Sequence, residues 1–198
     1  THPTWDSILK HLGKALNDSV KLNSWCRRNN VLTGGEYLLL WIASMIQYPT
    51  EPLPYLFIYG DKQCTGKSTF HESLSLLFSE GSVVRADHAL KNSDFNAELA
   101  TAILCVVEET DLKRNKSANN KIKDWTTSSS LSVHKKGETP YTRENTTHWV
   151  QCANPRSACP IFPGDTRITM VHVMHQPEHV INRVELFKKL KSIFLSFC

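Results

Sequence analysis

The sequence predicts an α/β fold in which helices flank a parallel sheet and a helical segment precedes it. Two observations indicate this class. Short apolar runs such as "YLFIYG" (55–60) and "ILCVV" (103–107) alternate with longer amphipathic segments, as strands alternate with helices in such sheets. The loop "GDKQCTGKST" (60–69) then joins the first apolar run to an amphipathic segment, which is a strand–loop–helix arrangement.

Residues 1–50 form the predicted N-terminal helical segment. Within it, Trp5, Ile8, Leu9, Leu12 and Leu16 recur at helical spacing. We expect Gly34-Gly35 to break the chain before a second, strongly apolar helix over 35–48. Prolines at 49, 52 and 54 end that helix, because proline lacks the N–H that a helix interior requires.

Residues 51–176 form the predicted core, and 177–198 the predicted amphipathic closing helix. In chain order, the core pattern predicts a strand at 55–60, a helix at 67–78, a strand at 82–86, a helix at 93–102, a strand at 103–110, a helix at 119–127, a hairpin at 131–142 that turns at Lys136-Gly137, and strands at 147–154 and 166–173.

Composition excludes several classes of protein. The longest apolar run, "YLLLWIASMI", is too short for a membrane helix, which needs about 20 such residues. Six scattered cysteines without a CxxC pair or a histidine at zinc-ligand spacing indicate a reducing compartment and no disulfide framework. The net charge of +4 is weakly basic, but residues 113–143 hold eight Lys/Arg against two acids. Such a stretch is typical of a phosphate-binding surface or of a solvated face.

The loop after the first strand resembles a phosphate-binding P-loop with one extra residue. The P-loop pattern has four residues between its first glycine and the Gly-Lys-Ser/Thr, whereas five separate Gly60 from Gly66 and Asp61 stands where the first glycine belongs. In this motif the lysine, here Lys67, reaches the phosphates, and the hydroxyl, here Ser68, binds Mg²⁺. The predicted nucleotide-binding residues are Gly60, Gln63, Cys64, Thr65, Gly66, Lys67, Ser68 and Thr69.

Polar residues follow three further predicted strands. Glu108 and Glu109 end the run "ILCVVEET", where the first acid would hold Mg²⁺ and the second would act as general base. Asn154 ends "THWVQCAN", a strand that we expect between the two strands that carry the loop and the acids, and it would orient the attacking water. Arg167 in "GDTR" is the predicted arginine finger, with Arg156 as a rival.

The ordered set "GKST", "ILCVVEET", "IKDWTTSSSLSVHKKGETPY", "VQCAN" and "GDTR" resembles a superfamily 3 helicase. The likeness covers roughly residues 36–175 and is strongest to primase-helicases of phages and mobile elements, including the poxvirus-type family. It implies an AAA+-like P-loop NTPase fold, ATP and Mg²⁺ as ligands, and a ring, usually of six subunits, that translocates on single-stranded DNA. Asp61 and the longer loop depart from the family pattern and bear on nucleotide affinity.

The resemblance assigns the roles already given to Lys67, Ser68, Glu108, Glu109, Asn154 and Arg167, and it adds a basic pore hairpin. DNA-binding residues would be His134, Lys135 and Lys136 on that hairpin, with Lys123 at the start of the motif. Because the chain begins with Thr, we expect a fragment of a longer protein with a linked primase or polymerase domain. The resemblance also implies a location in the host-cell cytoplasm and no membrane partner.

Two other function classes remain open at this point. One is a non-hydrolysing DNA-binding or assembly module whose altered loop has lost activity. The other is a P-loop enzyme of another class, such as a small-molecule kinase or a protein-remodelling AAA+ ATPase. No insertion of lid size follows "ILCVVEET", which disfavours the kinase, and the basic hairpin disfavours the remodeller.

Overall fold

The computed structural model describes residues 2–91, 94–108, 110–154, 166–175 and 182–195. Five strands form one parallel sheet in the order β2-β3-β6-β1-β7, and two more form a separate hairpin, β4-β5. The strands are β1 (Tyr55–Tyr59), β2 (Val83–Arg85), β3 (Leu104–Val107), β4 (Ser130–Val133), β5 (Tyr141–Glu144), β6 (His148–Ala153) and β7 (Ile168–His172). The helices are α1 (Pro3–Gly13), α2 (Asn17–Leu22), α3 (Ser24–Arg28), α4 (Gly34–Gln47), α5 (Thr69–Leu74), α6 (Asp87–Leu90), α7 (Lys116–Trp125) and α8 (Arg183–Leu195), with 3-10 turns at Lys14–Leu16 and Ala97–Ala100.

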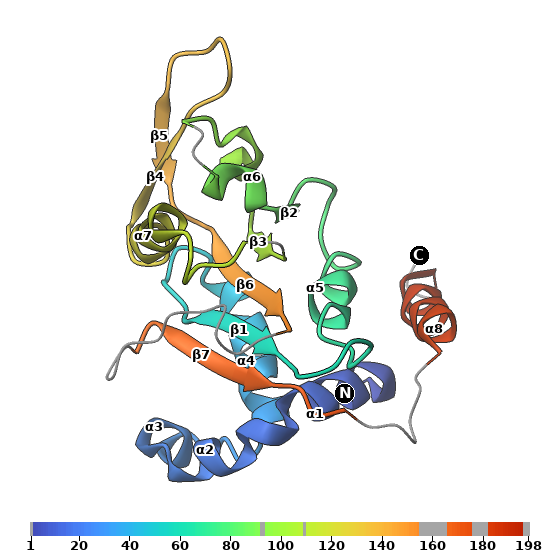
Figure 1. Cartoon of the computed structure of the whole chain (residues 1–198). Coiled ribbons are helices and arrows are strands. Elements are labelled where there is room, and N and C mark those ends of the chain that lie inside the picture. Colours follow the sequence, from blue (N-terminus) through green and yellow to red (C-terminus); the bar gives the residue numbers. More distant parts are fainter. Residues whose placement is uncertain (1, 92–93, 109, 155–165, 176–181, 196–198) are drawn as a thin grey trace.

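The predicted α/β class is confirmed, and strand β6 lies where the sequence predicted, between β1 and β3. All four strand pairings in this sheet are parallel, so the carboxyl ends of the five strands meet at one edge. The hairpin is also confirmed, since β4 and β5 pair antiparallel across a turn with Gly137 at φ +83°. It projects away from the sheet, far from α2 and α3 (Figure 1).

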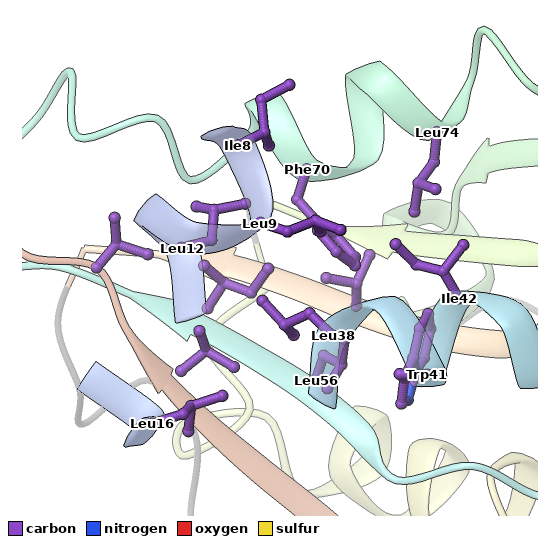
Figure 2. Packing of buried hydrophobic residues seen from close by; sticks show 14 of the residues in the cluster. Ile8, Leu9, Leu12, Leu16, Leu38, Trp41, Ile42, Leu56, Phe70 and Leu74 are labelled. Atoms are coloured by element: carbon purple, nitrogen blue, oxygen red, sulfur yellow. The ribbon is translucent and has the colours of Figure 1, made fainter. Parts of the chain in front are cut away.

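Alternate residues along the strands face two hydrophobic cores. Leu56 and Ile58 of β1 point to the core that α1, α4 and α5 cover, whereas Tyr55 and Phe57 point to the core under α6, α7 and β4. This two-residue period is why a buried central strand reads as a continuous apolar run. Figure 2 shows the first core, where side chains of α1, α4, β1 and α5 converge. The N-terminal helices therefore share one core with the sheet.

Helix α4 begins earlier than the sequence predicted. Gly34 and Gly35 do not break the chain but form its first turn, which Thr33 caps in a capping box with Glu36. A Cβ on Gly13 would lie 2.3 Å from the carbonyl carbon of Gly34. Gly13 and Gly34 therefore allow the backbones of α1 and α4 to touch. The local sequence pattern could not show this contact, because it depends on where the other helix lies.

Two other predictions were wrong. The helix expected over 93–102 is a 3-10 turn at Ala97–Ala100, and a separate short helix, α6, precedes it. The helix after the loop does not start at Lys67, because α5 begins at Thr69 and ends at Leu74. No described helix is long and apolar enough to cross a membrane.

The close contact of the two helices leads to a stability prediction. Gly13→Ala should lower the free energy of unfolding by about 1–3 kcal/mol, because the new methyl group has no space and the backbone must shift. The measurement is urea denaturation of the variant beside Gln47→Ala, an exposed position on α4. Equal stability of both variants would mean that the helices do not cross this closely.

Candidate functional site

The loop between β1 and α5 turns back on itself through two left-handed residues. Cys64 has φ +58° and Gly66 has φ +87°, on either side of Thr65, which is 5% exposed. A Cβ on Gly60 would lie 2.8 Å from the carbonyl oxygen of Val173, so this position needs glycine as the loop leaves the sheet. The loop thus reverses direction at Cys64 and Gly66 and leaves the sheet closely packed against β7.

Lys67 folds back over this loop. Its Nζ donates to the carbonyl oxygen of Lys62 at 2.9 Å and to Oγ1 of Thr65 at 3.1 Å. Burial lowers the pKa of the Lys67 ammonium. The two oxygen atoms therefore direct the Lys67 charge into the loop.

Asp61, the residue that departs from the P-loop pattern, pairs with a neighbouring strand. Its Oδ2 lies 3.5 Å from Nε2 of His172, at the end of β7. The His172 ring in turn stacks on Tyr59, with the ring centroids 4.9 Å apart. Asp61 is largely exposed, so this contact fixes the outer part of the loop only weakly.

Glu108 follows β3 and reaches the same edge of the sheet. Its two oxygen atoms pair with Nε2 of His71 at 3.1 Å and with Nη2 of Arg85 at 3.0 Å. Burial lowers the pKa of His71, against the pull of Glu108, so the ring donates this bond as a neutral imidazole. The Glu108 backbone N–H also donates to Asp87 at 3.3 Å, which fixes the chain direction after the strand.

Strand β6 lies between β1, which carries the loop, and β3, which ends before Glu108. On β6, the Cys152 thiol donates to the carbonyl oxygen of Lys67 at 3.5 Å. Burial raises the pKa of Cys152 to about 12, so the thiol is neutral at ordinary pH. Lys67 and Glu108, predicted from separate motifs, thus lie on the two sides of one central strand.

Strand β6 also fixes the segment that follows Glu108. The buried Gln151 accepts a hydrogen bond from the hydroxyl of Tyr55 at 2.9 Å and donates to the carbonyl oxygen of Thr110 at 2.7 Å. Glu109, the predicted base, lies outside the described residues, as does Arg156. Asn154 follows β6 at the carboxyl edge and is exposed.

Arg167 does not join these residues within the chain. It directly precedes β7, and its carbonyl oxygen accepts from the N–H of Tyr55 at the start of β1. The loop begins at the other end of β1, four residues further on, which is about 13 Å along an extended strand. Arg167 therefore lies at the amino edge of the sheet, away from Lys67 of the same chain.

The basic stretch divides into structural and exposed charges. Arg143 donates to the carbonyl oxygens of Leu99 and Ala100. Lys121 donates to the carbonyl oxygens of Ala89 and Lys91. These two side chains therefore hold backbone segments of the chain in place. Lys135 is partly buried and pairs with Glu138 at 3.6 Å, whereas Lys136 is exposed on the hairpin loop.

The other two predicted DNA-binding residues lie at different places. His134 packs its ring against Phe95, with centroids 4.8 Å apart, and its N–H donates to Asn96. Lys123 lies on α7 and is partly buried. His134 thus begins the hairpin loop and contacts Phe95 and Asn96, and Lys135 and Lys136 follow it in the same loop.

Two side chains near the loop are of the kind that binds Mg²⁺. The described residues contain no cluster of three or more His, Cys, Asp or Glu side chains that could hold a metal. Magnesium bound with phosphates needs only one or two protein ligands. A carboxylate at Glu108 and a hydroxyl at Ser68, the residue before α5, are therefore suitable in kind.

A cavity of about 490 Å³ lies between α5 and α8 and contains none of the loop residues. Glu72, Arg183 and Phe187 are among the side chains that line it. Glu72 pairs with Arg183 at 2.6 Å, and burial raises the pKa of its carboxyl group. The cavity is a groove between two helices rather than part of the loop.

Sequence reasoning missed several residues that contact the loop or the acid, among them His11, His71, Arg85 and Asp87. His71 lies three residues after Ser68 and follows from helical spacing once α5 is assumed. Arg85 ends β2, the strand next to β3, and Asp87 begins α6 two residues later, so the strand order predicts both positions. His11 carries no local signal, because its partner is 54 residues away.

A family model described as "Family of unknown function (DUF5906)" matches residues 58–167. Among curated proteins no sequence matches the chain.

The chain is similar in structure to the apo C-terminal region of NrS-1 (305–718), with a TM-score of 0.73 and 20% identity over 96% of this chain and 43% of that one. The A-form apo structure of the same region gives a TM-score of 0.72 and 20% identity, covering 96% of this chain and 42% of that one. The chain therefore spans less than half the length of these structures. At this identity the likeness establishes the fold alone.

Proposed function

The chain belongs to the DUF5906 family, whose function is unknown, and we propose that it is the ATP-hydrolysing helicase domain of a larger DNA-replication protein. The observation that carries the proposal is the placement of the loop with Lys67 and of Glu108 on the two sides of strand β6, at the carboxyl edge of a parallel sheet. Ligands bind at this edge in open α/β sheets, and the resemblance to superfamily 3 helicases supplies the chemistry.

In this proposal the chain's own groups divide the work of phosphoryl transfer. The loop from Gly60 to Thr69 surrounds the phosphates, with Lys67 against the outer ones. Ser68 and Glu108 would hold Mg²⁺, which supplies charge neutralisation when bound. Glu109 would take the proton of the attacking water and Asn154 would orient that water.

For Glu108 to bind the metal, its contacts with His71 and Arg85 must loosen or rearrange. The ion pair with the exposed Arg85 contributes little and exchanges readily for a cation, whereas the bond from the largely buried His71 is the contact that must rearrange. This arrangement favours a site that becomes competent on nucleotide binding.

Arg167 enters the proposal as a group donated to a neighbouring subunit. Its location at the amino edge, far from Lys67 of its own chain, favours action in trans. A ring of subunits would supply that neighbour, and single-stranded DNA would pass along the hairpins. A linked primase or polymerase domain is part of the same proposal.

Lys67→Ala should weaken ATP binding at least about ten-fold, since a charge-assisted hydrogen bond contributes about 1.5–3 kcal/mol. Isothermal titration with ATP and Mg²⁺ measures this, beside the thermal unfolding of each variant. Lys62→Ala is the matched control, because Lys62 is an exposed lysine of the same loop that contributes only its carbonyl oxygen to Lys67.

If the wild-type protein bound no ATP, the non-hydrolysing DNA-binding or assembly module would be the correct reading. If Lys62→Ala and Lys67→Ala weakened ATP binding equally, the loop would attract nucleotide only through its net charge.

Replacing both Lys135 and Lys136 by alanine should weaken binding to a labelled oligo-dT strand. It should also reduce the slope of log affinity against log salt by about 1.4, since each phosphate contact on a single strand contributes about 0.7. The measurement is fluorescence anisotropy over a salt series.

The control for this pair is Lys113→Ala with Lys116→Ala. These are exposed lysines of the same basic stretch outside the hairpin, so the control removes the same net charge. An equal loss of oligo-dT affinity in both double variants would contradict a specific role for the hairpin.

A further inference from the structure

A histidine of the N-terminal helix supports the loop from outside the sheet. Nε2 of His11, in α1, lies 2.8 Å from the carbonyl oxygen of Thr65. A carbonyl oxygen only accepts, so the ring nitrogen is the donor in this bond. The bond joins residues 54 positions apart and connects the helical segment directly to the middle of the loop.

Thr65 is the point at which the loop most needs support. Its neighbours Cys64 and Gly66 are both left-handed, and a non-glycine residue persists there only where its surroundings hold it. The Thr65 side chain is also one of the two oxygen partners of the Lys67 ammonium. The bond from His11 therefore fixes the backbone carbonyl group of Thr65, the residue whose side chain directs the Lys67 ammonium.

The position of His11 is itself set by the core. Leu9 and Leu12 beside it are buried against α4 and the sheet (Figure 2). Two residues after His11, the backbones of Gly13 and Gly34 touch. A Cβ on Gly66 would lie 3.7 Å from Nε2 of His11, so the ring packs against the loop as well as bonding to it. The packing of α1 therefore places the imidazole beside the loop.

We propose that His11 is a positioning residue of the phosphate loop, through which helix α1 sets the affinity of the loop for nucleotide. The geometric part of this inference stands on the contact alone, and the nucleotide part rests on the proposed function. Its consequence is that the helical segment before the sheet belongs to the site and that a displacement of α1 weakens nucleotide binding at Lys67.

The test compares His11→Gln with His11→Glu. The two side chains have nearly the same shape, but the glutamine amide keeps a donor for the Thr65 carbonyl oxygen, whereas the ionised glutamate offers only acceptors. Ser7→Glu is the charge control, because it adds one negative charge at an exposed position one turn earlier on α1.

The first readout is amide hydrogen exchange over residues 60–68 without nucleotide. We expect about ten-fold faster exchange in His11→Glu, and near wild-type exchange in His11→Gln and Ser7→Glu. The second readout is titration with ATP and Mg²⁺, where His11→Glu should bind about ten-fold more weakly and His11→Gln within about three-fold of wild type.

Unchanged loop exchange in His11→Glu would overturn the inference, whatever the protein does with ATP. Faster exchange with ATP affinity unchanged would overturn the coupling to nucleotide binding. Faster exchange in a protein whose wild type binds no ATP would instead leave the mechanical support intact and refute the proposed function. Equal effects of His11→Gln and His11→Glu, with lower thermal stability in both, would reduce His11 to a packing residue.

Discussion

The insertion of β6 between β1 and β3 is the constraint on which the rest of the structure depends. Parallel pairing on both sides brings the carboxyl ends of the three strands together, so the loop after β1 and the acid after β3 flank β6. The Cys152 thiol then donates to the carbonyl oxygen of Lys67, while Gln151 fixes the segment beyond Glu108 from the other face of the same strand. Strand β6 thus presents side chains on both faces of the sheet and lies between the loop and Glu108.

The helices before the sheet do more than cover it. A contact between Gly13 and Gly34 fixes α1 on α4, both helices share a core with β1 and α5, and His11 extends this rigid unit to the loop. The loop contains a left-handed cysteine, Cys64, so it depends on such contacts more than a loop with glycine at that position would. Asp61, which replaces that glycine, contacts His172 and connects the other side of the loop to β7.

The sequence was sufficient where the determinants are local. The apolar runs of the strands and the Lys136-Gly137 turn each carry their own pattern, and these elements appear where they were predicted. It was insufficient where a residue's environment comes from elsewhere in the chain. Gly34 reads as a breaker until α1 is placed against it. Arg143 belongs to a basic stretch typical of a phosphate-binding or solvated surface until the carbonyl oxygens of Leu99 and Ala100 are seen, and His11 has no sequence neighbour that reveals its partner.

The most direct test of the account is ATP hydrolysis by an equimolar mixture of Lys67→Ala and Arg167→Ala, in the presence of single-stranded DNA. Each variant alone should be nearly inactive. Mixed rings would contain interfaces that pair an intact loop with an intact arginine, so the mixture should recover a substantial part of wild-type turnover. A mixture as inactive as its components, beside an active wild type, would contradict the sharing of the site between subunits, and a wild type that hydrolyses no ATP at any concentration would contradict the account as a whole.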